Sequence, residues 1–415
     1  RGTTRLFPAP VGAVLIGNGC GKLVDDIRFI LKIQLRRLPE MRLTPTSRGY
    51  QIWKEPPLPM FLDFYFFNWT NPEQINDNST RPHVIEMGPY RFRETKEKVN
   101  ITWNNENSTV SYRQLRRWYY VEEESNGNLD DNITTLNVIA ASAVYSSRDW
   151  SFLRQKGVEL GLAMFHQTIS VTKTVRELLF EGYEDPLLDL ANSLPRSETN
   201  APRNGSTTND GYFNMATGVD NMDHFGVLKN WNNASRTNFF EGECGKVQGS
   251  AGEFFPSKLT KTEPISLFSP DICRTMSFDY DETIFIENIP AYKYSSGDRL
   301  LDNGTIFEEN KCFCVGECQP SGLVNVSACR YGSPAFVSLP HFHKADPSYR
   351  QSVKGLSPDN DKHNFYMALE PVRKETFGVT YGRGVGYQIN GSQAAIPTLA
   401  SQIVIHLTKY VYYTR

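Results

Sequence analysis

The sequence lacks a long hydrophobic run and an excess of either charge. No stretch of about eighteen consecutive apolar residues occurs in it, so no segment is expected to cross a membrane as a helix. Its 44 basic and 46 acidic residues give a net charge of −2, so charge alone does not indicate nucleic acid as a partner. With 415 residues, the chain can form a substantial core in one large domain or two smaller ones.

Catalytic motifs are also missing. The sequence contains neither Gly-x-Ser-x-Gly nor His-Glu-x-x-His, its seven histidines are scattered, and the glycines of 17–22 lack the spacing of a phosphate-binding loop. His341-x-His343 with Asp346 could hold a metal ion if a strand placed both histidines on one side. A structural role without metal is favoured. We therefore expect no enzyme, no cofactor and no metal.

The most informative stretch that is present runs from Pro59 to Asn71. It is densely aromatic, and the turn signal Asn71-Pro72 closes it, which is typical of a strand. Its aromatic residues are Phe61, Phe64, Tyr65, Phe66, Phe67 and Trp69. A strand with apolar side chains on both faces must be covered on both sides, so we expect it to be central in a sandwich or barrel.

Two further segments are predicted to be strands. Residues 87–94 alternate in polarity after a turn at Gly88-Pro89, and Thr109–Val121 lies between asparagine-rich loops. A glycine loop is expected at Gly382–Gly386. Together the strands indicate a long antiparallel system.

Between Thr134 and Leu194 the strand signals stop and helical signals replace them. One helical stripe is formed by Trp150, Leu153, Leu160 and Met164, and Val158, Leu162 and Phe165 widen it. Thr174 and Glu177 have the spacing of a capping box, and Asp185-Pro186 resembles a helix start. These features predict a helical insertion within a β protein.

Cysteines and glycosylation signals both point to export. Six of the seven cysteines lie between Cys244 and Cys329. Asn-x-Ser/Thr signals occur at Asn68, Asn78, Asn100, Asn107, Asn132, Asn204, Asn233, Asn303, Asn325 and Asn390. The secretory pathway permits both glycans and disulfides, so a disulfide framework is preferred over a zinc site at Cys312-x-Cys314 and Cys318.

Several motifs in unbroken order resemble the class B scavenger receptors, the family of platelet glycoprotein IV and lysosomal integral membrane protein type 2. The similarity covers roughly Leu35 to Pro371, and Phe180-Glu181 looks more like the insect branch. The motifs are Trp53-Lys-x-Pro-Pro-x-Pro59, Tyr65-Phe-Phe-Asn-x-Thr-Asn-Pro72, Gly88-Pro-Tyr-x-Phe-Arg-Glu94, Leu136-Asn137, Glu177-Leu-Leu, Gly182-Tyr-x-Asp-Pro186, Ser269-Pro-Asp-Ile-Cys-Arg274, Ser338-Leu-Pro-His-Phe342 and Ala345-Asp-Pro347.

The resemblance implies an α+β fold. Its parts are a large irregular antiparallel β-barrel, an apolar tunnel through the barrel and an apical helical bundle. The implied domains are an N-terminal segment 1–34, helical or poorly ordered, a single ectodomain 35–390 with the apex at about 148–194, and an atypical C-terminal segment 391–415. Family members normally have a membrane span at each end. Neither span is visible here, so we expect an ectodomain or a truncated form of a membrane-attached protein.

The resemblance also implies three disulfides. The family pattern joins Cys244 to Cys312, Cys273 to Cys329, and Cys314 to Cys318. The last pair closes a shorter loop than in many relatives.

In function, the resemblance implies a scavenger or lipid receptor at the cell surface or lysosomal membrane, more at the plasma membrane than at the lysosome. Its expected partners are fatty acids, sterols, carotenoids or hydrophobic odorants, together with lipoproteins or apoptotic and microbial surfaces. Lipid would pass through the tunnel toward the membrane. The alternative is a protein-recognition receptor, phagocytic or enzyme-trafficking, without lipid transfer.

Ligand contacts are expected at the apex, where platelet glycoprotein IV has a lysine pair that meets anionic ligands. In this chain Met164 and His166 occupy that neighbourhood. The expected charged contacts are Lys156, His166 and Lys173, and the expected apolar contacts are Phe152, Leu160 and Met164. In the alternative interpretation, the apolar three pack the bundle and the lysines are only solvated.

Overall fold

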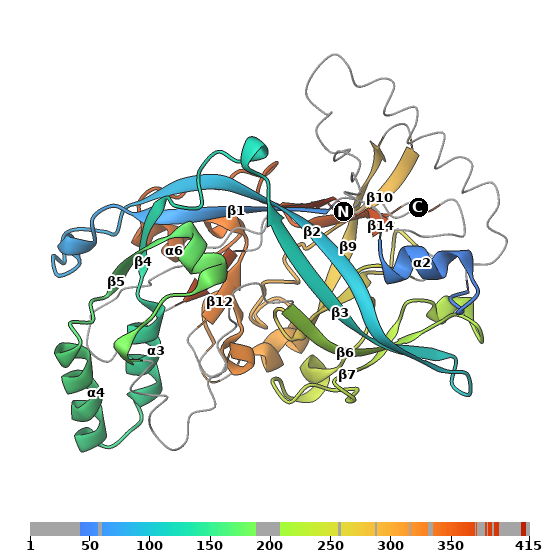
Figure 1. Ribbon diagram of the computed structural model, residues 1–415, viewed down its shortest axis with the longest axis horizontal. Coiled ribbons are helices and arrows are strands. Elements are labelled where there is room, and N and C mark those ends of the chain that lie inside the picture. The colour runs from blue at the N-terminus through green and yellow to red at the C-terminus, as the bar shows by residue number, and fades with distance from the viewer. Residues whose placement is uncertain are drawn as a thin grey trace, which may run out of the picture.

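The structure, a computed structural model, is a mixed fold of antiparallel sheets and helices (Figure 1). It describes residues 42–56, 60–187, 208–255, 259–286, 289–314, 316, 318–330, 335–369, 371, 378–379, 381–383, 386–389 and 408–411. The expectations for segment 1–34, Cys20, Asn204, Asn390 and most of 391–415 lie outside these residues. Within the described part of the chain, no helix has the length and hydrophobicity needed to cross a membrane.

The aromatic stretch forms strand β1 (Met60–Trp69), as predicted. It lies inside a seven-stranded sheet with the order β15-β17-β1-β2-β3-β6-β7. Its neighbours are β2 (Val84–Asn104) on one side and β17 (Thr408–Val411) on the other. Seven of the ten residues of β1 are buried, so both of its faces are covered.

The turn predicted at Gly88-Pro89 is wrong, because β2 continues through both residues. The pairing with β1 shifts here, from Phe64 opposite Tyr90 to Phe66 opposite Met87. A bulge accommodates a proline that cannot donate a ladder hydrogen bond. Gly88 has φ +130° and approaches the Phe64 carbonyl oxygen closely, which a side chain would prevent.

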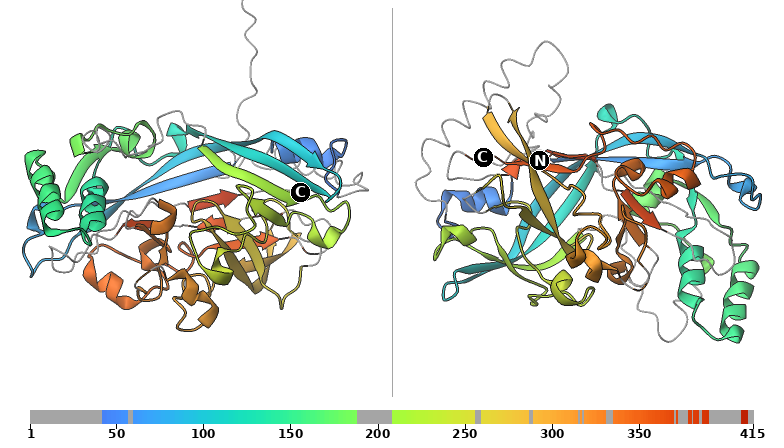
Figure 2. Two further views of the ribbon diagram at one scale, coloured as in Figure 1. Left: turned by 90° about the horizontal axis from the view of Figure 1, so that it is seen from below. Right: turned by 180° about the vertical axis from the view of Figure 1, so that it is seen from behind.

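Two large sheets form most of the molecule. The second contains five strands in the order β14-β13-β10-β9-β8, and smaller sheets join β11-β12-β16 and β4-β5. The strands of the seven-stranded sheet drawn in blue and cyan run along one side, and the strands drawn in yellow and orange lie against it (Figure 2). The remaining strands are β3 (Thr109–Tyr120), β4 (Asn132–Leu136), β5 (Ser170–Thr174), β6 (Thr208–Ala216), β7 (Leu228–Trp231), β8 (Ile265–Ser269), β9 (Arg274–Ile286), β10 (Ile289–Ser295), β11 (Val324–Asn325), β12 (Ala335–Ser338), β13 (Tyr366–Leu369), β14 (Gly378–Val379), β15 (Tyr381–Arg383) and β16 (Gly386–Ile389).

The helices are short, and most lie outside the sheets. They are α2 (Arg48–Lys54), α3 (Val138–Ser147), α4 (Phe152–Met164), α6 (Pro347–Ser352) and a π-helix at Glu177–Glu181. The predicted helical insertion is therefore present, but it is not purely helical. Strands β4 and β5 pair antiparallel at its base, so the expected loss of strands from Thr134 onward is wrong. The glycine loop expected at Gly382–Gly386 also overlaps β15 and β16.

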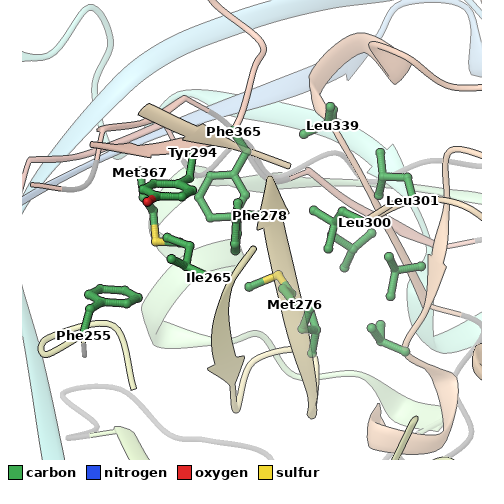
Figure 3. Packing of buried hydrophobic residues seen from close by; sticks show 14 of the residues in the cluster. Phe255, Ile265, Met276, Phe278, Tyr294, Leu300, Leu301, Leu339, Phe365 and Met367 are labelled. Carbon is green, nitrogen blue, oxygen red and sulfur yellow. The ribbon is translucent and has the colours of Figure 1, made fainter. Parts of the chain in front are cut away.

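Buried side chains form separate clusters within this framework. One lies between the five-stranded sheet and the chain that connects β10 to β13, and Figure 3 shows Tyr294, Phe278, Phe365 and Met367 converging there. The rings of Phe278 and Phe365 meet edge to face at 5.0 Å. A second cluster joins β3 and β6 to β8 through Tyr112, Phe213 and Phe268. Contacts between distant segments thus hold the two large sheets together.

The structure contains the three disulfides that the resemblance implied. They join Cys244 to Cys312, Cys273 to Cys329, and Cys314 to Cys318, with sequence separations of 68, 56 and 4 residues. The first two close long loops, for which removal of a native disulfide typically costs about 2–5 kcal/mol.

Candidate ligand-binding site

The α3–α4 unit projects from the end of the molecule opposite β9 and β10 (Figure 1). Asn137 fixes its base. The Asn137 side chain accepts a hydrogen bond from the Ala140 N–H (3.0 Å) and so caps α3, while it donates to Gln167 Oε1 at 2.7 Å. The Asn137 N–H donates to the Ile169 carbonyl at 2.8 Å. The chain therefore enters and leaves the helical unit at one clamped point.

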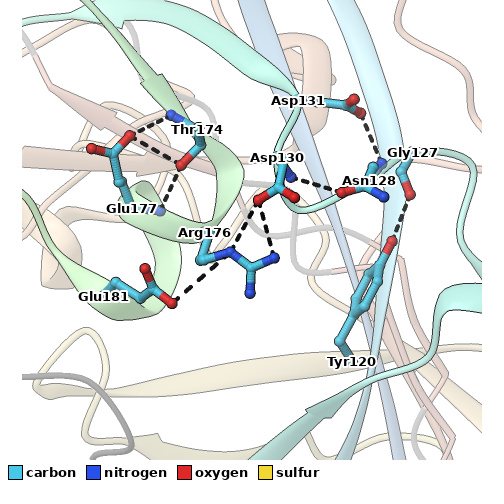
Figure 4. A network of polar contacts seen from close by, with 9 residues as sticks. All are labelled: Tyr120, Gly127, Asn128, Asp130, Asp131, Thr174, Arg176, Glu177 and Glu181. Carbon is cyan, nitrogen blue, oxygen red and sulfur yellow. Dashed lines mark hydrogen bonds and ion pairs between the residues drawn. The ribbon is translucent and has the colours of Figure 1, made fainter.

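A second polar network ties this unit to the sheet (Figure 4). The guanidinium of Arg176 donates to Asp130 at 3.0 Å, and the Tyr120 hydroxyl donates to the Gly127 carbonyl at 2.5 Å. Thr174 and Glu177 form the predicted capping box, in which the Thr174 N–H and hydroxyl both donate to Glu177. These hydrogen bonds lower the pKa of Glu177.

Helix α4 carries large apolar side chains on its outer face. The exposed fractions of Phe152, Leu153, Leu160 and Met164 are 73, 81, 63 and 62%. The half-buried side chains Val158, Leu162 and Phe165 lie on the opposite face. The interpretation that Phe152, Leu160 and Met164 pack the bundle is therefore wrong. The helix packs through the residues predicted only to widen the stripe.

The structure brings four of the six predicted contact residues onto one line of α4. Phe152, Lys156, Leu160 and Met164 are spaced four residues apart, so they follow one another along the helix surface. The Lys156 ammonium lies 5.8 Å from the Phe152 ring centroid and pairs with Glu159 at 2.5 Å.

The other two predicted residues lie apart from that line. His166 is exposed, with φ +50°, just after α4. Lys173 is on β5, where its ammonium lies 3.8 Å from Glu177 and 4.6 Å from the Tyr183 ring centroid.

The glycosylation signals differ in exposure. Asn78, Asn100, Asn107, Asn132 and Asn233 are exposed, whereas Asn68, Asn303 and Asn325 are half-buried. Asn303 donates to the Gln319 carbonyl at 2.8 Å, and Asn68 accepts from the Thr134 N–H at 2.8 Å. A glycan is attached to the amide nitrogen, so at Asn303 it would replace a hydrogen bond, whereas the five exposed asparagines offer room for a glycan at the surface.

The placement of His341 and His343 on one strand is wrong. His341 lies in a 3-10 turn (Pro340–Phe342) with φ +53°. It pairs with Glu86 and stacks on His363 at 4.5 Å, while His343 contacts Asn364 at 3.1 Å. Among the described residues, no group of three or more potential ligands is arranged to hold a metal ion. The two histidines thus face different partners.

Comparison with known proteins assigns this sequence to a family. The sequence model of the CD36 family matches residues 22–401, nearly the whole chain. The chain belongs to the CD36 family. Protein peste of Drosophila melanogaster is 41% identical over 403 residues, which cover 94% of this chain and 71% of that protein. Scavenger receptor class B member 1 of Rattus norvegicus is 35% identical over 347 residues, covering 82% and 67% respectively.

A third similar protein is a lysosomal membrane protein by name. Lysosome membrane protein 2 of Rattus norvegicus is 32% identical over 359 residues, covering 84% of this chain and 72% of that protein. The greater identity with the Drosophila protein agrees with the insect-like residues Phe180-Glu181. The chain is a class B scavenger receptor of insect type.

Inside this CD36-family chain, β2 carries a row of charged residues that our sequence reasoning missed. Glu94, Lys96 and Lys98 alternate along the strand and are all buried. Burial raises the pKa of Glu94 and lowers the pKa of Lys98. The available signal was the period of two that leads from Tyr90 and Phe92 to Glu94, Lys96 and Lys98, because alternate residues share one face of a strand. The interior therefore contains polar positions as well as apolar clusters.

Proposed function

We propose that this chain is the ligand-binding part of a receptor for hydrophobic ligands or lipoproteins. The α4 surface binds the particle or amphiphile, and lipid passes through an apolar tunnel in the interior toward the membrane. The receptor is attached to a membrane, at the plasma membrane more than at the lysosome. This proposal takes its direction from the relatives named scavenger receptor and lysosome membrane protein.

The observation that carries the proposal is the exposed apolar line on α4. Large apolar side chains in a cluster at the end of a molecule are typical of an interaction surface. Covering one side chain the size of Leu160 or Met164 contributes about 1.5–3 kcal/mol. Three or four of them can hold a lipid surface without any reactive group.

Lys156, on this surface, and Lys173, on β5 apart from it, are cations that suit ligands with anionic headgroups. Lys156 is exposed on α4, and Lys173 is partly covered on β5. Lys156 pairs with Glu159 on α4, and Lys173 pairs with Glu177 of the π-helix that follows β5. Such solvent-accessible pairs contribute little to stability. A phosphate or carboxylate on the ligand can therefore replace the glutamate at low cost.

Transfer through the interior needs affinity for apolar matter rather than catalysis. Each methylene moved from water into an apolar environment contributes about 0.8 kcal/mol. An apolar route removes most of the desolvation barrier that a water-insoluble ligand would otherwise meet. The proposal therefore assigns no catalytic role to any residue.

The test uses cells that express the full-length receptor, with lipoprotein particles labelled separately in protein and in core lipid. The variant Phe152→Ser/Leu160→Ser removes apolar contacts from α4, and Ile306→Ser removes an equally exposed apolar side chain elsewhere. We expect at least tenfold weaker particle binding for the α4 variant and less than a twofold change for the control. Equal binding by all three proteins would contradict the assignment of α4.

The two labels also separate lipid transfer from recognition alone. A lipid receptor takes up core lipid in excess of particle protein, and its purified ectodomain carries lipid that mass spectrometry detects. If particle protein and lipid enter in equal proportion and no lipid co-purifies, the protein-recognition alternative holds instead.

A further inference from the structure

Four polar side chains from distant segments meet beside the aromatic cluster that joins the two large sheets. They are Trp53 of α2, Lys98 of β2, Tyr112 of β3 and Glu253 of the segment before β8, with exposed fractions of 3, 0, 1 and 9%. Trp53 and Tyr112 belong to the cluster that also contains Phe213 and Phe268. We call these four side chains the polar point; it borders the apolar region that the aromatic cluster forms.

An ion pair and two aromatic contacts connect these four side chains. Lys98 forms an ion pair with Glu253, and its ammonium lies 5.7 Å from the Trp53 ring centroid. The rings of Trp53 and Tyr112 meet edge to face with centroids 4.9 Å apart. Burial, and next the nearby charge of Glu253, raise the pKa of Tyr112, so its oxygen carries a proton.

Three polar atoms at this point make no hydrogen bond with any of the described residues. They are the indole Nε1 of Trp53, the hydroxyl of Tyr112 and the second carboxylate oxygen, Oε2, of Glu253. Buried polar groups are almost always paired, because leaving one unpaired is costly. Three such atoms from three segments around one ion pair indicate that the place is built to receive a polar group.

The chemistry of the three atoms defines that group. Trp53 can only donate a hydrogen bond, Glu253 can only accept one, and Tyr112 can do either. A hydroxyl fits because its oxygen accepts from Trp53 while its hydrogen is donated to Glu253. The Lys98–Glu253 pair has no net charge, so it offers no counter-ion to the carboxylate of an ionised fatty acid. The unpaired oxygen of Glu253 would also repel that carboxylate.

We propose that this polar point anchors the hydroxyl group of a hydroxylated apolar ligand, such as a sterol or long-chain alcohol, with its apolar body toward the aromatic cluster. The inference rests on the proposed function, since it assumes that lipid enters the interior. To that function the polar point adds selectivity among lipids. Alcohols bind more tightly than the corresponding ketones, and ionised fatty acids bind without contacting the polar point.

The test measures binding of two fluorescent probes to the purified glycosylated ectodomain. Dehydroergosterol carries a hydroxyl, and cis-parinaric acid carries a carboxylate. Tyr112→Phe removes only the unpaired hydroxyl, and Tyr294→Phe is the matched control, because the Tyr294 hydroxyl already donates to the Thr260 carbonyl at 2.7 Å. Competition by cholesterol and by cholestenone compares an alcohol with a ketone.

We expect Tyr112→Phe to weaken dehydroergosterol binding about tenfold and to change parinaric acid binding less than twofold. Cholesterol should compete about tenfold better than cholestenone with the wild type and less than threefold better with Tyr112→Phe. Without ligand, Tyr112→Phe should melt at a higher temperature than the wild type, because it loses a buried unpaired hydroxyl, whereas Tyr294→Phe should melt lower.

Other outcomes separate the two proposals. If both probes bind but Tyr112→Phe changes neither, the point holds at most a water molecule and the anchoring inference fails, while the lipid-receptor proposal stands. If neither probe binds to the wild type, the lipid-receptor proposal fails and the anchoring inference fails with it. A lower melting temperature for Tyr112→Phe would also overturn the inference, because its hydroxyl would then already be paired.

Discussion

Helix α4 and strand β2 reverse the usual distribution of residues. On α4, apolar side chains such as Leu153 and Leu160 point into solvent, and none of the helix residues is buried. On β2, the charged residues Glu94, Lys96 and Lys98 lie inside the molecule. The exposed apolar line indicates a surface for binding a partner. The buried charges indicate side chains that must be paired, because an unpaired charge is costly inside a protein.

The two regions also differ in how they are held. The α3–α4 unit is attached through a two-stranded ribbon and a few polar clamps, so its outer face can change without disturbing the core. Strand β2 pairs with β1 over residues 84–94 and with β3 over residues 92–104, and its side chains contact segments more than a hundred residues away. Changes on α4 should therefore affect binding, and changes on β2 should affect stability.

The largest effect is expected from breaking the interior ion pair. Lys98→Met leaves the Glu253 carboxylate buried without its cation, which typically costs about 3–5 kcal/mol of unfolding free energy. Urea denaturation followed by circular dichroism measures this loss. The exposed Lys156→Met on α4 is the matched control and should change stability by less than about 0.5 kcal/mol.

A double variant sharpens the same comparison. Lys98→Met/Glu253→Leu removes both charges, so it should be more stable than Lys98→Met alone. If Lys98→Met is as stable as Lys156→Met, the ion pair does not stabilise the interior.

A smaller effect is expected from pH. Burial, and next the charge of His341, lower the pKa of His363 from 6.5 to about 4. The unfolded chain takes up this proton near pH 6.5 and the folded chain only near pH 4, so acidification across that window favours unfolding. At about 1.4 kcal/mol per pKa unit, the full difference between the two pKa values corresponds to about 3.5 kcal/mol. Because each state is only half titrated at its own pKa, the loss between pH 6.5 and pH 4 is on the order of 2–3 kcal/mol.

Comparing two histidine variants measures this contribution. His363→Gln should flatten the decline in unfolding free energy between pH 6.5 and 4, and His166→Gln beside α4 should leave the decline unchanged. Parallel curves for wild type and His363→Gln would show that His363 stays charged in the folded protein or does not titrate in this window.

The smallest effect on stability is expected on the outer face of α4. Leu153→Ser should change the unfolding free energy by less than about 0.5 kcal/mol, because Leu153 is exposed in the folded state. Leu136→Ser on β4 removes a buried side chain of the same type and should cost at least about 2 kcal/mol. If the two variants lose the same unfolding free energy, α4 packs against another part of the molecule through its outer face.

Much of the sheet and of the covalent framework could be predicted. The aromatic density of β1 requires burial on both faces wherever the strand lies, and its length matches the predicted stretch closely. The cysteine pairs followed from the resemblance, since spacing alone leaves the pairing open. Gly88-Pro89 was misinterpreted because a turn and a bulge use the same residues, and only the partner strand distinguishes them.

The helical insertion was predicted from the sequence, but the orientation of α4 within it was not. Leu160 and Met164 were predicted to lie on one helical stripe, and α4 contains both, since helical spacing is a local property. Whether that line faces the core or solvent depends on which side α3 occupies, and helical periodicity carries no information about a neighbour.

The sequence by itself determined the family of this protein, its central aromatic strand and the residues that α4 can present. Only the tertiary structure decided that the apolar line of α4 faces outward and that Trp53, Lys98, Tyr112 and Glu253 meet at one point. The physical reason is that secondary structure follows from local patterns, whereas the Lys98–Glu253 contact joins residues 155 positions apart. Such a contact forms only when the sheets have packed together.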